Sequence, residues 1–449
     1  MSDAPFDTKS LVAAYETHNQ SLNHGKGQSE SGDSGALGWG ESGILDGFVK
    51  LYEATEDRVW LDRIVKHFDR MLSSRADAFG DGHPTWATST YSVGLIRTGR
   101  LHNRGCATIG PEEDRVWVIR GGDAVVDARR IIEFETRRNY RMFEYGTRKV
   151  MARGVYRPGK PVEGMGPFKV MLEGRPEPGD RFWVEMRAGE ALEYIVHQGM
   201  FLYPVSRFVE HALSNKDLKA SYGDKAREYL NVIGSDVADK HERDWVDTSQ
   251  SAGAYRFTPT TTERFPNRIL PHNQYLALGR PFLVLQDASR KRLYGDRAAR
   301  MARNFRKHLR KTGQAYTWHY WDWVEEGEPG HSGVEDTGHG HIDIGFSVEA
   351  CRRGIVFTDA DLKRFAHTLL DQMWNGSLED PVIGGRVDTR DGNSVPLGDW
   401  MDLCQWDPKV WDVMWAVFEK AGRPAAGIPS VLQAWRRLEE GKSRRSRKK

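Results

Sequence analysis

The sequence predicts a mainly α fold, an (α/α) toroid of helical hairpins that carries an antiparallel β insertion. Three observations lead to this prediction. Amphipathic helices recur in pairs, the turns at one end of the pairs are short and polar, and the loops at the other end are long and aromatic. A chain of such hairpins closes naturally into a ring with its long loops gathered at one rim. The 449 residues, 39% apolar and 29% charged, have a globular composition.

The chain begins with a short helix and a Gly/Ser-rich stretch, residues 1–35, which we expect to form a mobile loop. We expect the first part of the toroid at residues 36–112. Its clearest helix places Trp60, Ile64 and Phe68 on one face at helical spacing. Looser copies of this pattern occupy 222–232, 283–309, 354–374 and 407–418, within a second toroid segment expected at 191–440. Their unequal spacing excludes a strict solenoid repeat.

Residues 113–190 interrupt the helical pattern with short β-rich runs separated by Gly, Pro and Asp. We therefore expect an antiparallel insertion there. The segment 441–449 is expected to be a disordered basic tail. From Arg436 onward eight Lys or Arg face two Glu, which leaves 57 basic and 61 acidic residues before it. An acidic body does not favour nucleic acid as a partner.

Several classes of protein are disfavoured by what the sequence lacks. It has no apolar run long enough for a membrane span, so no membrane partner is expected. It has no phosphate-binding GxxxxGK[ST] loop, no GxGxxG after a strand, no GxSxG and no HExxH. Its start lacks a secretory signal, and Cys106, Cys351 and Cys404 show no pair spacing, so a cytoplasmic location is expected. The oligomeric state stays open.

Four motifs at the expected hairpin mouths give the chain a family resemblance: GWGE at 38–41, PHNQY at 271–275, YTWHYW at 316–321 and EDTGHGH at 335–341. They resemble the loops of (α/α) toroid carbohydrate-active enzymes, especially alginate and glucuronan lyase-like polysaccharide lyases. The resemblance implies a saccharide substrate and β-elimination next to a uronic acid carboxylate. The β insertion departs from the simplest toroids of that group.

The aromatic run YTWHYWDW at 316–323 is one candidate for binding sugar. Six of its eight residues are Trp, Tyr or His, and such rings stack on pyranose faces while their N–H and O–H groups bond hydroxyls. We therefore expect Tyr316, Trp318 and Trp321 to bind substrate. The alternative is a packed aromatic loop.

The segment HSGVEDTGHGHID at 331–343 places Glu335, Asp336, His339, His341 and Asp343 within nine residues. Such a loop suits proton transfer near neutral pH, with His339 in a catalytic role and Glu335, Asp336 and His341 contacting substrate. It would also suit a divalent metal, for which Glu335, His339, His341 and Asp343 are the candidates. The sequence requires no cofactor. The alternative is helix capping.

The motif PHNQY begins an apolar helix. A lyase must neutralise the substrate carboxylate, remove the C5 proton and protonate the leaving oxygen. The resemblance implies that His272 and Asn273 neutralise the carboxylate while Tyr275 or Tyr320 transfers protons. The alternative assigns His272 and Asn273 to the helix N-cap. We expect the catalytic candidates to converge with Glu335, His339 and His341 on one pocket.

Weaker candidates for substrate contact are Trp39, Glu41, Trp86 and His197, together with Arg256 as a partner for the substrate carboxylate. Other functions remain open. A glycoside hydrolase would pair Asp336 with Glu41 or Asp399. A uronyl C5-epimerase would share the proton abstraction, and a non-catalytic helical-repeat protein would bind glycan without turnover.

Overall fold

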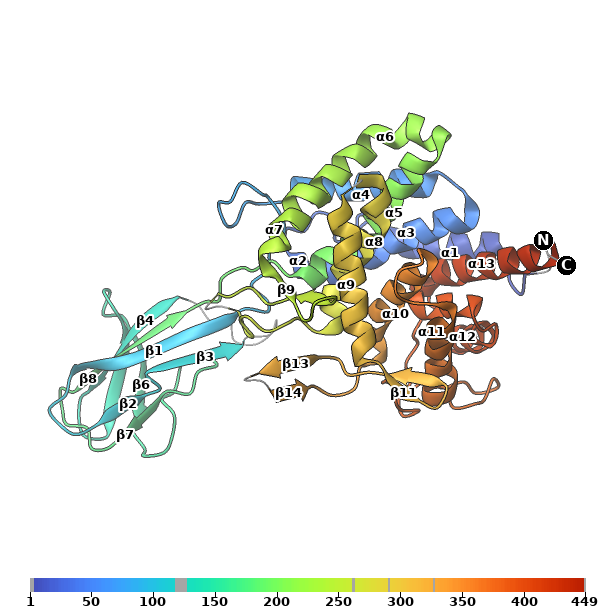
Figure 1. Cartoon of the computed structure of the whole chain (residues 1–449). Coiled ribbons are helices and arrows are strands. Elements are labelled where there is room, and N and C mark those ends of the chain that lie inside the picture. Colours follow the sequence, from blue (N-terminus) through green and yellow to red (C-terminus); the bar gives the residue numbers. More distant parts are fainter. Residues whose placement is uncertain (1–3, 118–126, 261–262, 290, 326–327, 448–449) are drawn as a thin grey trace. The chain divides into compact units, whose positions relative to one another are not determined.

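A computed structural model describes residues 4–117, 127–260, 263–289, 291–325 and 328–447. The chain divides into two compact units. The helical unit comprises Met1–Ala87, Glu193–Phe257 and Arg268–Lys449, and the sheet unit comprises Thr88–Leu192 and Thr258–Asn267. About 48% of the chain is helical, so the protein combines α and β structure (Figure 1). Within the described residues no helix has the length and apolar character needed to cross a membrane.

The inner elements of the helical unit are mostly buried around their whole circumference. They are α3 (Ser42–Thr55), α5 (Ile195–Ser214), α8 (His272–Ser289), α10 (Thr337–Arg352), the 3-10 segment η5 (Gly398–Gln405) and α13 (Ile428–Arg447). They pack in chain order: α3 on α5, α5 on α8, α8 on α10, α10 on η5, η5 on α13, and α13 back on α3. Helices α5, α8 and α10 bury residues on every side, which requires such surroundings.

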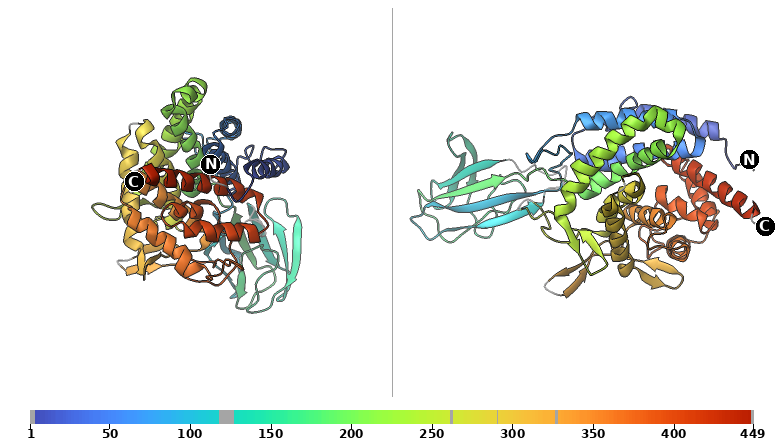
Figure 2. Two further views of the ribbon diagram at one scale, coloured as in Figure 1. Left: turned by 90° about the vertical axis from the view of Figure 1, so that its right-hand side faces the viewer. Right: turned by 45° about the horizontal axis from the view of Figure 1, so that its top comes forward.

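A second helix lies against each inner element (Figure 2). These outer helices are α4 (Val59–Ser73) on α3, α6 (Lys216–Asn231) on α5, α9 (Arg292–His308) on α8, α11 (Asp359–His367) on α10, α12 (Lys409–Lys420) on η5, and α1 (Thr8–Ser21) on α13. Helix α4 buries Trp60, Ile64 and Phe68 along one stripe, as its sequence predicts. One apolar stripe is what a surface helix needs.

Short elements complete the helical unit. They are α2 (Ser34–Ala36), η1 (Leu37–Glu41), η2 (Val232–Ala238), α7 (Asp239–His241), η3 (Glu242–Asp244), η4 (Thr368–Met373), η6 (Ala425–Gly427) and the strand pairs β9 (Trp245–Asp247) with β10 (Gly253–Tyr255), β11 (Arg310–Thr312) with β12 (Ala315–Thr317), and β13 (Asp322–Glu325) with β14 (Glu328–His331).

The sheet unit contains a six-stranded antiparallel sheet in the order β3-β1-β8-β4-β5-β6 and a pair β2-β7. The strands are β1 (Val93–His102), β2 (Thr108–Gly110), β3 (Glu113–Trp117), β4 (Ala128–Phe134), β5 (Asn139–Glu144), β6 (Val150–Val155), β7 (Met171–Glu173) and β8 (Arg181–Arg187). Alternation sets its register: Phe182, Val184 and Met186 face the core. On the other face Glu133 pairs at 2.9 Å with both Arg141 and Arg181, its partners across the two neighbouring strands.

The sheet unit starts at Thr88, earlier than the insertion expected at 113–190, and includes Thr258–Asn267. The sequence signal of β1 is weak because Gly94 and Gly99 dilute its alternation. A Cβ on Gly99 would lie 2.5 Å from the indole nitrogen of Trp183, so the glycine makes room for that ring.

Two terminal segments also differ from expectation. Residues 22–30, expected to be mobile, fold into turns, and the backbone N–H of Gln28 donates to Oε2 of Glu41 at 2.7 Å. The expected disordered tail instead continues α13 as far as Arg447.

Candidate functional site

One carboxylate begins α10 and also positions an imidazole. Oδ1 of Asp336 accepts the backbone N–H of His339 at 2.8 Å and so caps the helix. Oδ2 of Asp336 lies 2.5 Å from Nδ1 of His339. This hydrogen bond raises the pKa of His339 above its ordinary value. The His339 side chain is 40% exposed, and with Nδ1 held by Asp336 its Nε2 is the atom placed for proton exchange.

Two aromatic rings flank this imidazole. The centre of the Tyr320 ring lies 5.3 Å from the centre of the His339 ring, and the centre of the Trp39 ring lies 6.1 Å from it. The Tyr320 hydroxyl accepts a hydrogen bond from Gln274 at 3.3 Å, and burial raises the pKa of Tyr320 to about 12. Trp39 is 45% exposed. A neutral phenol and an accessible indole therefore stand beside the histidine.

A buried pair of acids lies close in sequence to the same helix start. Glu335 and Asp343 are both buried and their carboxyl groups interact electrostatically, and Asp343 accepts the indole N–H of Trp318 at 2.8 Å. Burial raises the pKa of Glu335, and it raises the pKa of Asp343 to about 7. Oε2 of Glu335 and Oδ1 of Asp343 have no hydrogen-bond partner within the described chain. Two such oxygens fit a shared proton.

Two further polar groups belong to this region. Asn273, in the first turn of α8, is 1% exposed, and both atoms of its amide lack a partner in the described part of the protein. Such a buried amide is expected to pair with water or a ligand. Arg386 forms a β-bridge with Asp336 and is 57% exposed in its side chain, with Asp388 at 3.3 Å. Paired residues of an antiparallel bridge project to the same side. Sequence reasoning missed Arg386 because it stands alone in a long loop.

His272 and Tyr275 do not join His339. Nδ1 of His272 lies 2.7 Å from the Tyr275 hydroxyl, which also accepts from Asn304 at 3.1 Å. Nε2 of His272 lies 2.9 Å from Asp322. Tyr275 is fully buried, and burial raises its pKa well above the ordinary value. These side chains form a network of their own, and the described residues show no contact between them and His339, so their expected convergence with His339 on one pocket stays a prediction.

The expected sugar-stacking aromatics are mostly core residues. Trp318 donates to Asp343, Trp321 to the carbonyl of Ile269 at 2.7 Å, and Tyr316 to Asp361 at 2.8 Å. Trp86 is 1% exposed and bonds the Met71 carbonyl. The polar tips that suggested sugar hydroxyls are satisfied inside the protein, which is the packed-loop alternative.

The weaker candidates are also held by internal partners. Glu41 is buried, with Nδ1 of His67 at 2.5 Å. His197 lies 3.1 Å from the Ser34 hydroxyl, and burial lowers its pKa to about 4. Arg256 faces Asp244 at 4.0 Å.

His341 belongs to a buried ion network rather than to the His339 pair. Its Nδ1 lies 3.3 Å from Oδ2 of Asp399, which Arg280 contacts at 2.9 Å. Lys50 contacts the other oxygen of Asp399 at 3.4 Å. Against the cost of burial, Arg280 and Lys50 hold the pKa of Asp399 well below its usual range. Asp399 is therefore an ionised structural partner and is poorly placed to act as an acid.

A cavity of about 900 Å³ in the helical unit is lined by other residues, among them Glu53, Arg207, His211, Arg352, Arg436 and Arg437. The four arginines named here are already paired with acids, as Arg437 is with Glu53 at 3.0 Å. None of the candidate catalytic, substrate-binding or metal-binding residues named from the sequence lines this cavity. We place the candidate site at His339, because a carboxylate, an imidazole and a phenol lie next to one another there.

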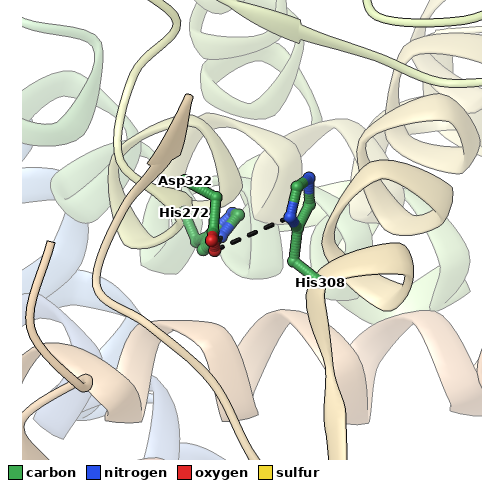
Figure 3. A group of neighbouring side chains, drawn as sticks. All are labelled: His272, His308 and Asp322. Atoms are coloured by element: carbon green, nitrogen blue, oxygen red, sulfur yellow. Dashed lines mark hydrogen bonds and ion pairs between the residues drawn. The ribbon is translucent and has the colours of Figure 1, made fainter. Parts of the chain in front are cut away.

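Among the described residues, two groups bring metal-ligand atoms within 4.8 Å of one another: Glu335, Asp336 and His339, and, separately, His272, His308 and Asp322 (Figure 3). The first group shares Glu335 and His339 with the metal ligands expected from the sequence. The other two expected ligands have different partners: His341 contacts Asp399, and Asp343 accepts from Trp318. The second group was missed, because His308 ends a basic helix and Asp322 is embedded in an aromatic run.

Comparison with known proteins gives little. No family model and no curated protein matches the chain. Two crystal forms of FlgL from Xanthomonas campestris align over 44% of this chain, at 12% and 11% identity, covering 79% and 78% of FlgL. Their TM-scores are 0.18 and 0.16.

Proposed function

We propose that this protein is an (α/α) toroid enzyme that cleaves uronic-acid-containing poly- or oligosaccharides by β-elimination. The packing order of the inner elements supports the toroid, because α13 returns to α3 and each inner element is covered by an outer helix. The proposal for activity rests on the residues around His339.

The observation that carries the proposal is the imidazole of His339, oriented by Asp336 and flanked by the Tyr320 phenol. A histidine held at Nδ1 by a carboxylate is a suitable base at Nε2 near neutral pH, and the hydrogen bond to Asp336 raises its pKa above the ordinary value. The phenol stays protonated at that pH because its pKa is about 12. One group can therefore accept a proton while the other donates one.

In the proposed reaction Nε2 of His339 removes the proton on C5 of the uronic acid. The electron pair of that C–H bond forms the C4–C5 double bond, and the C4–O bond to the neighbouring sugar breaks. The Tyr320 hydroxyl gives its proton to the departing oxygen, and solvent restores both groups. The exposed indole of Trp39 offers a flat surface for one sugar ring.

The substrate carboxylate must be stabilised while the C5 proton leaves. Arg386 is the exposed cation beside Asp336, and its planar guanidinium suits a carboxylate. The unpaired amide of Asn273 is the second candidate. We prefer Arg386 to Arg256 because its side chain is 57% exposed, against 32% for Arg256.

The hydrolase alternative has less support. Glu41 and Asp399 are each bound to buried cationic or imidazole partners. Glu335 and Asp343 are both fully buried, so neither carboxyl group is placed to meet a glycosidic bond from solvent. A C5-epimerase shares the proposed proton abstraction and is separated by experiment.

The test uses purified full-length protein with alginate, glucuronan and glycosaminoglycan oligomers. Elimination creates an unsaturated uronide, which absorbs in the ultraviolet. Reducing ends without that absorbance indicate hydrolysis. Solvent deuterium entering C5 without chain cleavage indicates epimerisation. If no oligomer shows any of the three changes, the lyase proposal fails for these substrate classes.

A further inference from the structure

Side chains from three separate elements meet at one point away from the His339 pair. His272 begins α8, His308 ends α9, and Asp322 begins β13 (Figure 3). We propose that His272, His308 and Asp322 bind one divalent cation of the Zn²⁺ type. This inference does not depend on the proposed lyase activity.

The distances suit a shared cation. Nε2 of His272 lies 2.9 Å from Oδ2 of Asp322, and Nδ1 of His308 lies 3.6 Å from the same oxygen. The ligand atoms of all three residues lie within 4.8 Å of one another. Bonds of about 2.1 Å in a tetrahedral site separate neighbouring ligand atoms by roughly 3.4 Å. Shifts of about half an ångström would therefore bring Oδ2 of Asp322 to this separation from the nitrogen of each imidazole.

The donor types also agree. Two imidazoles and one carboxylate are ligands that Zn²⁺ and its neighbours in the first transition row accept, whereas Mg²⁺ and Ca²⁺ prefer oxygen alone. Three protein ligands leave a fourth position for water. The His308 side chain is 30% exposed and that of Asp322 13%, so an ion can enter from solvent.

A supporting layer holds these ligands in place. Nδ1 of His272 contacts the hydroxyl of Tyr275, which Asn304 fixes in turn. His319 contacts the other oxygen of Asp322 at 3.0 Å through its own Nδ1. Ligating histidines and carboxylates are usually oriented by hydrogen bonds of this kind. The support leaves Oδ2 of Asp322 as the oxygen toward which both imidazoles point.

A purely structural network explains the arrangement less well. One hydrogen bond from His272 would satisfy Oδ2 of Asp322, and His319 already serves Oδ1. His308 then remains beside Oδ2 at 3.6 Å, beyond a good hydrogen bond. A bound cation would be coordinated by His308 as well as by His272 and Asp322, and it would cross-link α8, α9 and β13.

The test measures metal binding by the full chain after chelation and dialysis. Calorimetry with Zn²⁺ and visible absorption with Co²⁺ are expected to show one tight site per chain. His308→Ala and Asp322→Asn are each expected to weaken that site by about 100-fold or more, since even supporting residues cost 10–100-fold. Zn²⁺ should raise the Tm of the wild type and leave that of His308→Ala unchanged.

Two controls locate the site. His367 faces Asp371 at 2.8 Å with a side chain 29% exposed, so His367→Ala removes a comparable surface histidine and should bind as the wild type does. His339→Ala removes the other group of candidate ligands and should also retain the site. The inference is overturned if the wild type binds no stoichiometric Zn²⁺ or Co²⁺, or if His339→Ala loses the site while His308→Ala keeps it. His308 is partly exposed, so that variant decides the question even if Asp322→Asn does not fold.

Discussion

Nδ1 of His339 and Oδ2 of Asp336 stand 2.5 Å apart at the first turn of α10. The same carboxylate caps the helix by accepting the backbone N–H of His339, so the residue that starts the helix also orients the imidazole. A side chain positioned by its own helix start is held more rigidly than one on a loop.

Removing either proposed proton-transfer group should reduce turnover without unfolding the protein. His339→Gln and Tyr320→Phe are each expected to lower kcat by about 100-fold or more, the usual size of an acid–base contribution. Steady-state kinetics on the oligomer that proves to be cleaved would measure this. His367→Gln and Tyr222→Phe are matched controls, since His367 also faces a carboxylate and Tyr222 also has a pKa of about 12. Full turnover in both site variants would remove these roles.

The pH profile should depend on Asp336. A base must be neutral, and the Asp336 hydrogen bond raises the pKa of His339 above 6.5. Activity is therefore expected to rise with pH, with a midpoint of kcat/KM above about 6.5. Asp336→Asn removes the negative charge that favours the imidazolium, so the midpoint should move to lower pH. An unmoved midpoint would show that another group titrates.

The Glu335–Asp343 pair should make stability fall as pH rises. Burial raises the pKa of Asp343 from 3.8 to about 7, so the folded state holds a proton that the unfolded state releases. The unfolding free energy should therefore decline between about pH 4 and pH 7. Denaturant titrations across this range should show a shallower decline for Asp343→Asn. Asp224→Asn, whose side chain is 99% exposed, should keep the wild-type slope. Equal slopes in all three proteins would contradict a shared proton.

Asp399 should be necessary for the stability of the helical unit. It neutralises Arg280 and Lys50 at a site where all three side chains are at most 6% exposed. Asp399→Ala leaves two buried cations without this partner, which typically costs about 3–5 kcal/mol. Urea unfolding would measure the loss, with Asp224→Ala as the exposed control. A cost below about 1 kcal/mol would mean that Asp46 alone, 2.7 Å from Lys50, compensates.

Helical periodicity was a good guide to the helices because it reports burial directly. The stripe of Trp60, Ile64 and Phe68 lies where the pattern predicts, and the β-rich runs after residue 113 form strands. Strand β1 was missed because its glycines weaken the alternation, and one of them, Gly99, makes room for Trp183, a contact 84 residues away. Periodicity contains no information about such distant partners.

The candidate site was predictable only where its geometry is local. Asp336 and His339 are three residues apart and meet through one helical turn, which sequence spacing can anticipate. Tyr316 and Trp318 bond Asp361 and Asp343, far along the chain. From sequence alone, a polar aromatic tip satisfied inside a core looks the same as one that awaits a ligand.

The contact between helices α5 and α8 should be highly sensitive to an added methyl group. A Cβ on Gly199 of α5 would lie 2.3 Å from the carbonyl carbon of Ala277 on α8, and backbone cannot move aside as a side chain does. Gly199→Ala is therefore expected to destabilise the fold by about 1–3 kcal/mol or more, by forcing the two helices apart.

Gly43 provides the matched comparison, because it is an exposed glycine inside α3 with nothing within 4 Å of the added Cβ. Gly43→Ala should stabilise the protein by about 0.5–1 kcal/mol through helix propensity. Urea unfolding of both variants separates steric clash from the intrinsic preference for alanine. If Gly199→Ala were as stable as Gly43→Ala, α5 and α8 would have to lie farther apart than this packing requires.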